Sequence, residues 1–266
     1  MLMESTNKPM IFESHAHYDD EVFDDDRDEL LSSMPEQGVS HIVNVAASLR
    51  SLTDIKKMME KYSHVYGAFG IHPDEIGDLN EEIFEQIKAL CQHEKTVAVG
   101  EIGLDYYWDK EKHNLQKKWF ERQMELARAE QMPFIIHSRD AAADTLDMAK
   151  GLKAGEIGGI VHCFSYGKDI AREYLNMGLY IGIGGVITFK NAKKLKEVVA
   201  YAPLEQLLLE TDCPYLAPAP YRGKRNTSLL IPYIAEEIAQ IKGISYEEVV
   251  QVTHENAMKV FALNEK

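Results

Sequence analysis

Eight short apolar segments alternate with longer amphipathic stretches along almost the whole chain. These segments, rich in β-branched residues, cover residues 10–14, 41–46, 65–71, 96–102, 133–137, 159–164, 179–184 and 206–212. Their continuous apolar character is typical of parallel strands that are buried on both faces. Helical patterns lie at 80–94, 115–131, 191–202, 228–242 and 245–262. Eight β–α units predict an α/β fold, a (β/α)8 TIM barrel; a doubly wound open sheet is the competing arrangement, and the strand count favours the barrel.

The length of 266 residues suits one such barrel, which commonly takes about 250 residues. Without any evident linker, we expect a single domain over 1–266, with residues 1–9 forming a flexible N-terminal extension. No apolar run reaches the ~20 residues that span a bilayer, and the N-terminus lacks the layout of a signal peptide. The cysteines Cys91, Cys163 and Cys213 form no spaced disulfide framework. A cytoplasmic protein with no membrane partner is the simplest interpretation.

The net charge of −14 narrows the class of partner. Broad binding to a phosphate backbone needs basic patches, and the overall charge argues against it. An acidic site that holds divalent cations is compatible with this charge, because each bound cation reverses the local field.

Polar side chains that can bind metal fall near the ends of the predicted strands. They are His15, His17, His72, Glu101, His137, His162 and Asp212. A single histidine at a strand end is more often a hydrogen-bonded structural residue than a ligand. In a barrel, however, the carboxyl ends of the strands form one rim, where active sites lie. Buried ionisable groups are costly unless they are paired or bind metal, so this accumulation predicts convergence on one site.

This donor set suits two divalent ions. His15, His17 and Asp212 would hold one ion, His137 and His162 the other, and Glu101 would bridge them. Mixed imidazole and carboxylate ligands fit Zn, Mn, Co or Ni well, whereas Mg prefers more oxygen. Two ions ~4 Å apart polarise a phosphoryl or carbonyl oxygen and lower the pKa of bound water.

Several other polar residues are candidates for substrate binding. His72 lies on the predicted rim. Asp105 could orient a ligand or substrate, or cap the next segment. Arg139 could bind an anion, since guanidinium matches phosphate geometry, or pair with neighbouring acids. The basic loop "YRGKRN" at 221–226, which contains Arg222, could bind an anionic substrate or remain solvated.

Taken together, the motifs resemble those of the TatD-type metal-dependent deoxyribonucleases, a branch of the amidohydrolase-like barrels. The matching stretches keep the family's order over nearly the whole chain and include "SHAHYD" (14–19), "GIHP" (70–73), "AVGEIGLDYY" (98–107), "PFIIHSRDA" (133–141), "GIVHCFSYG" (159–167), "LLLETDCPYLAP" (207–218) and "YRGKRN" (221–226).

The resemblance implies a (β/α)8 barrel that uses two divalent metals, and many such proteins cut DNA with Mg, often as 3′→5′ exonucleases. It implies one metal site at His15, His17, Glu101 and Asp212, and a second at Glu101, His137 and His162. The chain departs from the family pattern at Glu13, usually Asp, at Tyr18, usually Leu, and in the basic loop. That loop opens with Tyr221 where the family usually has His, and "NTS" (226–228) replaces the usual "NEP".

We therefore expect a hydrolase that cuts DNA phosphodiester bonds from a strand end or in a single strand. Glu101 and Asp212 are the expected catalytic residues, with Asp212 also able to receive the proton of the attacking water. A metal-dependent hydrolase of a small-molecule amide, lactone or phosphoester is the alternative. A barrel that binds without catalysis would require a broken metal set, and the set is whole.

Overall fold

The computed structural model of the protein describes residues 9–108 and 110–263. Within these residues eight parallel strands form one sheet, in which each strand pairs with the next along the chain. The strands are β1 (Ile11–Ala16), β2 (Val39–Val45), β3 (Val65–Phe69), β4 (Thr96–Asp105), β5 (Phe134–Arg139), β6 (Gly159–Val161), β7 (Tyr180–Ile183) and β8 (Leu207–Leu209).

The sheet closes between its first and last strands. The Asp212 amide donates to the His15 carbonyl over 3.0 Å, and the His17 amide donates to the Cys213 carbonyl over 2.9 Å. These two bonds join β1 to the segment that follows β8. The predicted TIM barrel is thereby confirmed, and the open doubly wound sheet is excluded.

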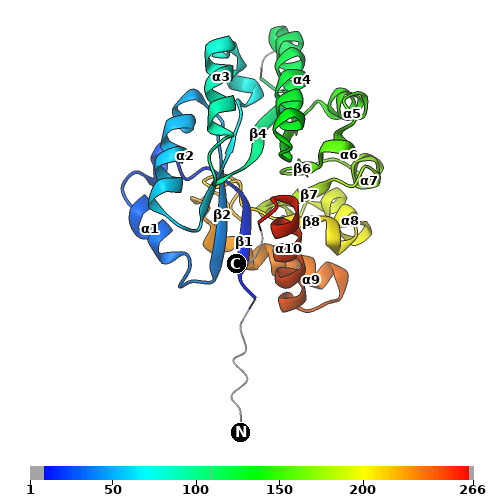
Figure 1. Ribbon diagram of the computed structural model, residues 1–266. Coiled ribbons are helices and arrows are strands. Elements are labelled where there is room, and N and C mark those ends of the chain that lie inside the picture. The colour runs from blue at the N-terminus through cyan, green and yellow to red at the C-terminus, as the bar shows by residue number, and fades with distance from the viewer. Residues whose placement is uncertain (1–8, 109, 264–266) are drawn as a thin grey trace.

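Helices surround the strands (Figure 1). They are α1 (Arg27–Ser33), α2 (Leu49–Lys61), α3 (Glu81–Leu90), α4 (His113–Glu130), α5 (Ala142–Gly151), α6 (Ala154–Ile157), α7 (Lys168–Asn176), α8 (Lys193–Tyr201), α9 (Ile231–Lys242) and α10 (Tyr246–Val260). The five helices expected from the sequence correspond to α3, α4, α8, α9 and α10. Helix α3 ends earlier than expected, at Leu90, whose carbonyl accepts the His93 amide and the Thr96 hydroxyl.

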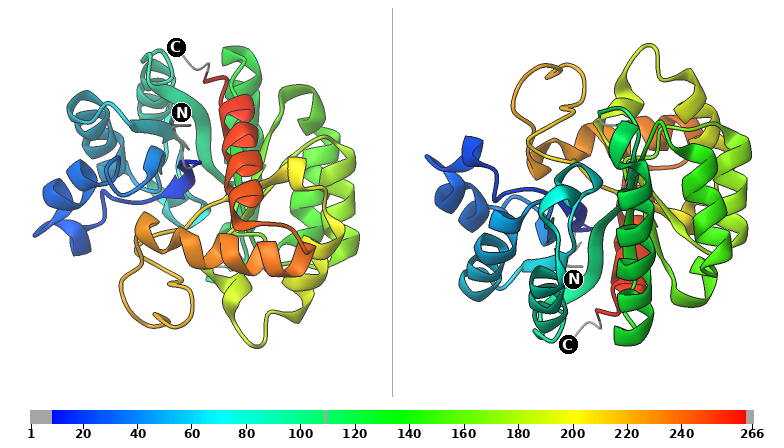
Figure 2. Two further views of the ribbon diagram at one scale, coloured as in Figure 1. Left: turned by 90° about the horizontal axis from the view of Figure 1, so that it is seen from below. Right: turned by 90° about the horizontal axis from the view of Figure 1, so that it is seen from above.

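The apolar core has two parts. One lies between the barrel and its helices; on α2, for example, Leu52, Ile55 and Met59 are buried toward the strands. The other lies inside the barrel, where Phe12 stacks on Phe261 beyond the end of α10. Helix α10 packs against β1 and β8, so the last helix contacts the strands at which the barrel closes (Figure 2).

Strand boundaries differ from the predicted ones in ways that matter for the site. Strand β1 continues through His15, and β4 continues four residues beyond Glu101, pairing with β5 as far as Asp105 and Arg139. Strands β6 and β8 end sooner than predicted. Beyond these ends, Cys163 (φ 43°) and Asp212 (φ 56°) have left-handed backbones, which are uncommon for non-glycine residues.

Two expectations from the sequence concern the ends of the chain and the membrane. The predicted N-terminal extension, residues 1–9, lies outside the described residues except for Pro9. Across residues 9–108 and 110–263, none of the helices combines the length and the apolar character needed to cross a bilayer.

Candidate metal centre

Four donor atoms from three parts of the barrel meet at the end of β1. The His15 Nε2 lies 3.1 Å from the His17 Nε2 and 3.3 Å from the Glu101 Oε2. The Asp212 Oδ1 completes the group, 3.3 Å from the His17 Nε2 and 3.8 Å from the His15 Nε2. The predicted convergence of β1, β4 and the segment after β8 is therefore what the fold produces.

A second donor group shares the same carboxylate. The other oxygen of Glu101, Oε1, lies 2.8 Å from the His137 Nδ1 and 2.7 Å from the His162 Nε2. These two imidazole nitrogens are 3.3 Å apart. Glu101 thus presents one oxygen to each group, which is the arrangement expected of a bridging ligand.

The local structure explains why these side chains meet. His15 and His17 are two residues apart on an extended segment, so both side chains leave it on the same face. Glu101 lies within β4, which runs close to β5 because Gly103 carries no Cβ. A Cβ at Gly103 would lie 2.0 Å from the His137 carbonyl oxygen, and the backbone there has a φ of +145°. Glycine is required at this approach.

The spacing of the donor atoms fits divalent ions. Ligand atoms about 2.1 Å from an ion, separated by tetrahedral or octahedral angles, lie ~3.0–3.4 Å from one another. Four donor pairs in the two groups have such separations, and four further pairs lie at 2.7, 2.8, 3.6 and 3.8 Å. The His17 Nδ1 donates to the Val45 carbonyl over 2.8 Å, which leaves the Nε2 of the neutral ring free to bind metal. The residues therefore fit the two ions suggested by the sequence.

Burial and the facing charges shift the pKa values of this cluster. Burial, assisted by repulsion from His162, lowers the pKa of His15 to about 4. Burial disfavours charge on His17 too, but hydrogen bonding and charge from Asp212 and Glu101 raise the pKa of His17 to about 10. Burial acts to raise the pKa of Glu101, yet the surrounding imidazoles hold this pKa well below its usual range. Protons held here must leave when a cation binds, which makes metal affinity pH-dependent.

Asp105 lies directly behind His137. Its Oδ2 is 3.2 Å from the His137 Nε2, and its Oδ1 accepts the Tyr107 amide over 2.8 Å. A carboxylate behind a ligating imidazole fixes the ring and its tautomer. The residue thus combines two of the roles considered from the sequence, since it orients a candidate ligand and caps the next segment.

His72 also belongs to the cluster. Its Nε2 lies 3.7 Å from the Glu101 Oε1, and its ring meets the His137 ring nearly edge to face at 4.2 Å. The Nδ1 accepts the Asp74 amide at the start of the short helix η2 (Pro73–Asp78). Burial and the neighbouring His137 lower the pKa of His72 to about 3, so the ring is neutral with Nε2 as the donor.

Glu210 is a buried carboxylate whose place beside the cluster was not predicted, although the sequence places it on one strand face with Asp212. Its Oε1 accepts the Cys163 amide over 2.5 Å and lies 3.9 Å from the His162 Nδ1. Gly182 leaves the space for it, because a Cβ there would lie 2.1 Å from the Glu210 Oε2. Burial raises the pKa of Glu210 to about 8. The sequence indicates that Glu210 and Asp212 lie on the same strand face, but it does not indicate the packing between β7 and β8 that makes room for Glu210.

Glu13 joins the first strand to the last, at the point where the barrel closes. Its Oε1 accepts the amides of Thr211 (2.9 Å) and His15 (3.2 Å). Its Oε2 accepts the hydroxyls of Thr211 (2.6 Å) and Ser228 (2.9 Å). Burial raises the pKa of Glu13 to about 7, while these four donors act in the opposite direction. Glu13 therefore supports the backbone beside the metal cluster rather than a ligand side chain.

Three of the departures from the family motifs meet in this one network. Tyr18 donates through its hydroxyl to the Ser228 Oγ over 2.7 Å and accepts the Ser228 amide over 2.9 Å. Ser228 in turn donates to Glu13. The longer acid, the tyrosine and the serine thus form a single buried chain of hydrogen bonds.

The arginines at the end of β5 and in the loop after β8 differ in their partners. Arg139, at the end of β5, stacks its guanidinium on the Tyr107 ring at 3.9 Å. Arg222 lies over the Phe189 ring at 4.5 Å and is exposed. Arg225 pairs with Asp26, at 2.7 Å and 2.5 Å through its two terminal nitrogens, and is therefore engaged. Arg139 and Arg222 remain the candidates for anion binding in the described structure.

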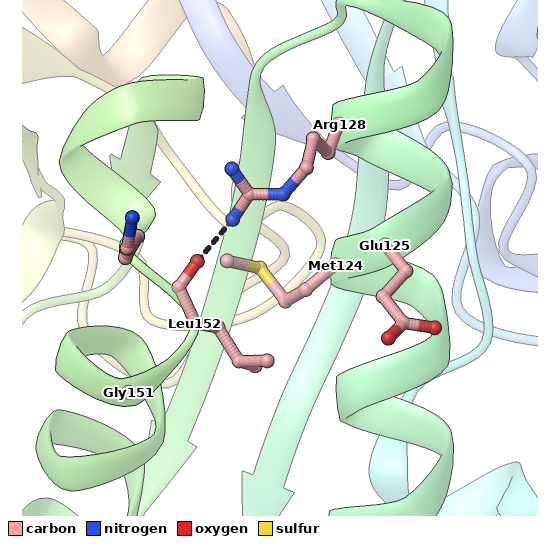
Figure 3. A pocket seen from close by; sticks show the side chains of 6 residues that line it. Met124, Glu125, Arg128, Gly151 and Leu152 are labelled. Carbon is pink, nitrogen blue, oxygen red and sulfur yellow. Dashed lines mark hydrogen bonds between the residues drawn. The ribbon is translucent and has the colours of Figure 1, made fainter.

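A separate hollow lies between α4 and the turn that follows α5 (Figure 3). Met124, Glu125 and Arg128 line it from α4, and Arg128 donates to the Leu152 carbonyl. None of the residues that line it belongs to the two donor groups. The metal cluster and this hollow are thus distinct features.

The sequence is similar to those of known metal-dependent hydrolases. Residues 12–262 match the family model described as TatD related DNase. The metal-dependent hydrolase YabD of Bacillus subtilis is 44% identical over 96% of this chain and 100% of its own length. The metal-dependent hydrolase YcfH of Escherichia coli is 35% identical, covering 96% of both chains.

A solved structure and a named nuclease extend the comparison. The crystal structure of YJJV, a TatD homolog from E. coli, matches with a TM-score of 0.90 and 28% identity over 96% of this chain and 98% of that chain. A protein of Rahnella named 3′-5′ ssDNA/RNA exonuclease TatD is 29% identical over 96% of this chain and 99% of its own. The chain belongs to the TatD family of metal-dependent hydrolases.

Proposed function

We propose that the protein is a two-metal phosphodiesterase that shortens single-stranded DNA from its 3′ end. The observation that carries this proposal is the sharing of Glu101 between two donor groups, with one oxygen in each. The name of the Rahnella relative, which gives single-stranded DNA and RNA as its substrates, supports single-stranded nucleic acid as the substrate class. The family itself supports the coarser statement that this chain is a metal-dependent hydrolase.

The metal ligands in this proposal are His15, His17, Glu101, His137, His162 and Asp212. When bound, two divalent ions supply Lewis-acid polarisation of a phosphoryl oxygen and activation of water. The imidazole-rich donor set suits Zn, Mn, Co or Ni, and Mg less well.

Exposure separates the residues that can meet substrate from those that only support it. The side chains of His17, His72, His137 and Asp212 are 10–17% exposed, whereas those of His15, Glu101 and His162 are 1–3% exposed. The more exposed residues define the side from which a phosphate would approach. Asp212 is on that side and carries a carboxylate, so it is the residue to accept the proton of the attacking water.

The remaining polar residues would orient the phosphate and the ligands. His72 presents a neutral N–H toward the Glu101 Oε1, where it can donate to a phosphoryl oxygen. Arg139 and Arg222 would supply positive charge to phosphates of the bound strand. Asp105, already bonded to His137 and the Tyr107 amide, orients His137 and does not contact substrate.

The test is a nuclease assay with a 5′-labelled single-stranded oligonucleotide, run beside lactone and amide substrates. Metal-loaded protein is expected to give a ladder that shortens from the 3′ end, and Glu101→Ala is expected to lose that activity. Cutting that survives chelation would refute the two-metal phosphodiesterase. Hydrolysis of a lactone or amide without cutting of DNA would favour the small-molecule alternative.

A further inference from the structure

Two aromatic side chains stand exposed immediately after β4, the strand that carries Glu101. Tyr107 is 53% exposed and Trp108 is 64% exposed, which makes Trp108 the most exposed large hydrophobic side chain in the described residues. An exposed tryptophan of this kind has no part in the apolar core. Its position next to the metal cluster indicates a role in binding.

The pair is held in a defined arrangement. The Trp108 ring meets the Tyr107 ring edge to face, with centroids 4.7 Å apart and planes at 87°. The Arg139 guanidinium lies 3.9 Å from the Tyr107 ring centroid and 5.5 Å from that of Trp108. Cation–π contacts of this kind favour one arrangement of the three side chains and leave part of the tryptophan surface open.

A short covalent and hydrogen-bonded path links the pair to the centre. Asp105 binds the Tyr107 amide with one oxygen and faces His137 with the other. The pairing of β4 with β5 sets Asp105 opposite Arg139. Since an extended chain advances ~3.3–3.6 Å per residue, Trp108 begins within about 12 Å of Asp105. That distance is short enough for one DNA strand to reach both the aromatic pair and the metal cluster.

We propose that Tyr107 and Trp108, with Arg139 on the Tyr107 ring, stack an unpaired nucleobase of the DNA strand whose end lies at the metal cluster. This inference rests on the proposed nuclease function and specifies single-stranded substrate. Proteins that bind single strands combine cations along the backbone with aromatic rings under the bases. In a chain of net charge −14, cations can supply only part of the affinity, so base stacking supplies the rest.

The first experiment compares variants on a single-stranded oligonucleotide. Trp108→Ala is expected to raise KM by roughly 5- to 150-fold, the effect of losing one base stack, with little change in kcat. Trp108→Phe, which keeps an aromatic face, is expected to restore most of the lost affinity. Tyr201→Ala is the matched control, because Tyr201 is also exposed but ends α8 just before β8 begins, away from the carboxyl ends of the strands.

An oligonucleotide with abasic positions near its 3′ end separates stacking from contacts to the backbone. On this substrate Trp108→Ala and the wild type are expected to have the same KM. An unchanged KM for Trp108→Ala on normal DNA would overturn the proposal. An equal rise on normal and abasic DNA would overturn it too, because the lost contact would then not involve a base.

A binding measurement tests the stacking site independently of catalysis. The chain has two tryptophans, and Trp119 is buried, so fluorescence quenching by a ligand reports mainly on Trp108. Chelated protein titrated with oligo(dT) is expected to show quenching that abasic DNA and Trp108→Phe do not reproduce. If the wild type cuts no DNA but this quenching is present, the nuclease proposal fails and the stacking site stands. Absence of quenching overturns the stacking site, and an exposed pair that instead binds another protein would give this result.

Discussion

Shortening Glu13 to aspartate is expected to loosen the barrel where β1 meets the segment after β8. Aspartate withdraws the carboxylate by about one C–C bond, ~1.5 Å. The bonds that Oε2 accepts from the hydroxyls of Thr211 and Ser228 are 2.6 and 2.9 Å long, so that withdrawal takes both beyond hydrogen-bonding distance. Each buried donor that loses its partner costs ~1–3 kcal/mol, while the two bonds between Ser228 and Tyr18 remain.

The net loss in the free energy of unfolding is expected to be about 2–4 kcal/mol. For a chain of this size it corresponds to a fall in Tm of roughly 5–15 °C. Urea and thermal unfolding of chelated protein measure the loss directly, because metal binding then adds nothing to the apparent stability. If the Tm of Glu13→Asp lies within about 1 °C of the wild-type Tm, these hydrogen bonds do not stabilise the closed barrel.

A double-mutant cycle with Ser228→Ala tests whether the network is one unit. Ser228 donates to Glu13, so the two substitutions are expected to be non-additive by ~0.5–3 kcal/mol. Ser33→Ala is the control, because the Ser33 hydroxyl bonds locally, donating to the Leu30 carbonyl and accepting from the Gln37 side chain, far from Glu13 in the chain. With it, Glu13→Asp is expected to add within ~0.3–0.5 kcal/mol. Equal additivity in the two cycles would refute the coupling inferred from the structure.

Three further outcomes follow from the site and from the opposite end of the barrel. Gly182→Ala places a Cβ 2.1 Å from the Glu210 Oε2 and should weaken Zn²⁺ binding, measured by calorimetry, by about 10-fold. Gly151→Ala is the control, because a Cβ there meets no atom within 4 Å and should leave the affinity unchanged. Equal Zn²⁺ affinities of the two variants would contradict the role of Gly182 in making room for Glu210. Asp105→Asn removes the carboxylate that faces the His137 ring and is expected to lower metal affinity by roughly 10–100-fold in the same assay. An unchanged affinity would show that the contact between Asp105 and His137 does not orient the ring. Burial, with repulsion from nearby histidines, lowers the pKa of His41 to about 4, so its contribution to stability is present above pH 6.5 and is lost as the pH falls toward 4. Urea unfolding of His41→Gln should therefore show a free energy of unfolding that depends less on pH over that range, by about 1–2 kcal/mol after allowance for solvent screening. An unchanged pH profile would exclude this contribution.

The sequence was enough to predict that the six candidate ligands lie on one rim, because strand order and strand direction decide which residues share a rim. His15 and Asp212 are far apart in the chain, yet parallel strands in a closed barrel bring their carboxyl ends together. Strand lengths were predicted less well. Strand β8 ends at Leu209, and no apolar pattern signals this end or the left-handed backbone at Asp212.

The supporting residues depend on contacts that periodicity cannot express. Glu210 fits beside His162 because Gly182, on a different strand, leaves the room. The effect of Glu13 could not be inferred from its neighbours in sequence, since its partners are Thr211 and Ser228 on the far side of the barrel closure. Hydrogen bonds between distant segments appear only once the fold has set their separation.

Glu101 is expected to place two metal ions side by side, one on each carboxylate oxygen. Mn²⁺ titration followed by electron paramagnetic resonance measures this directly, because two ions that share a carboxylate give a spin-coupled signal. The wild type is expected to bind two Mn²⁺ per chain with that coupled signal, and Glu101→Ala to lose the coupling and at least one ion. Two uncoupled ions in the wild type, or an unchanged coupled pair in Glu101→Ala, would contradict a bridging Glu101.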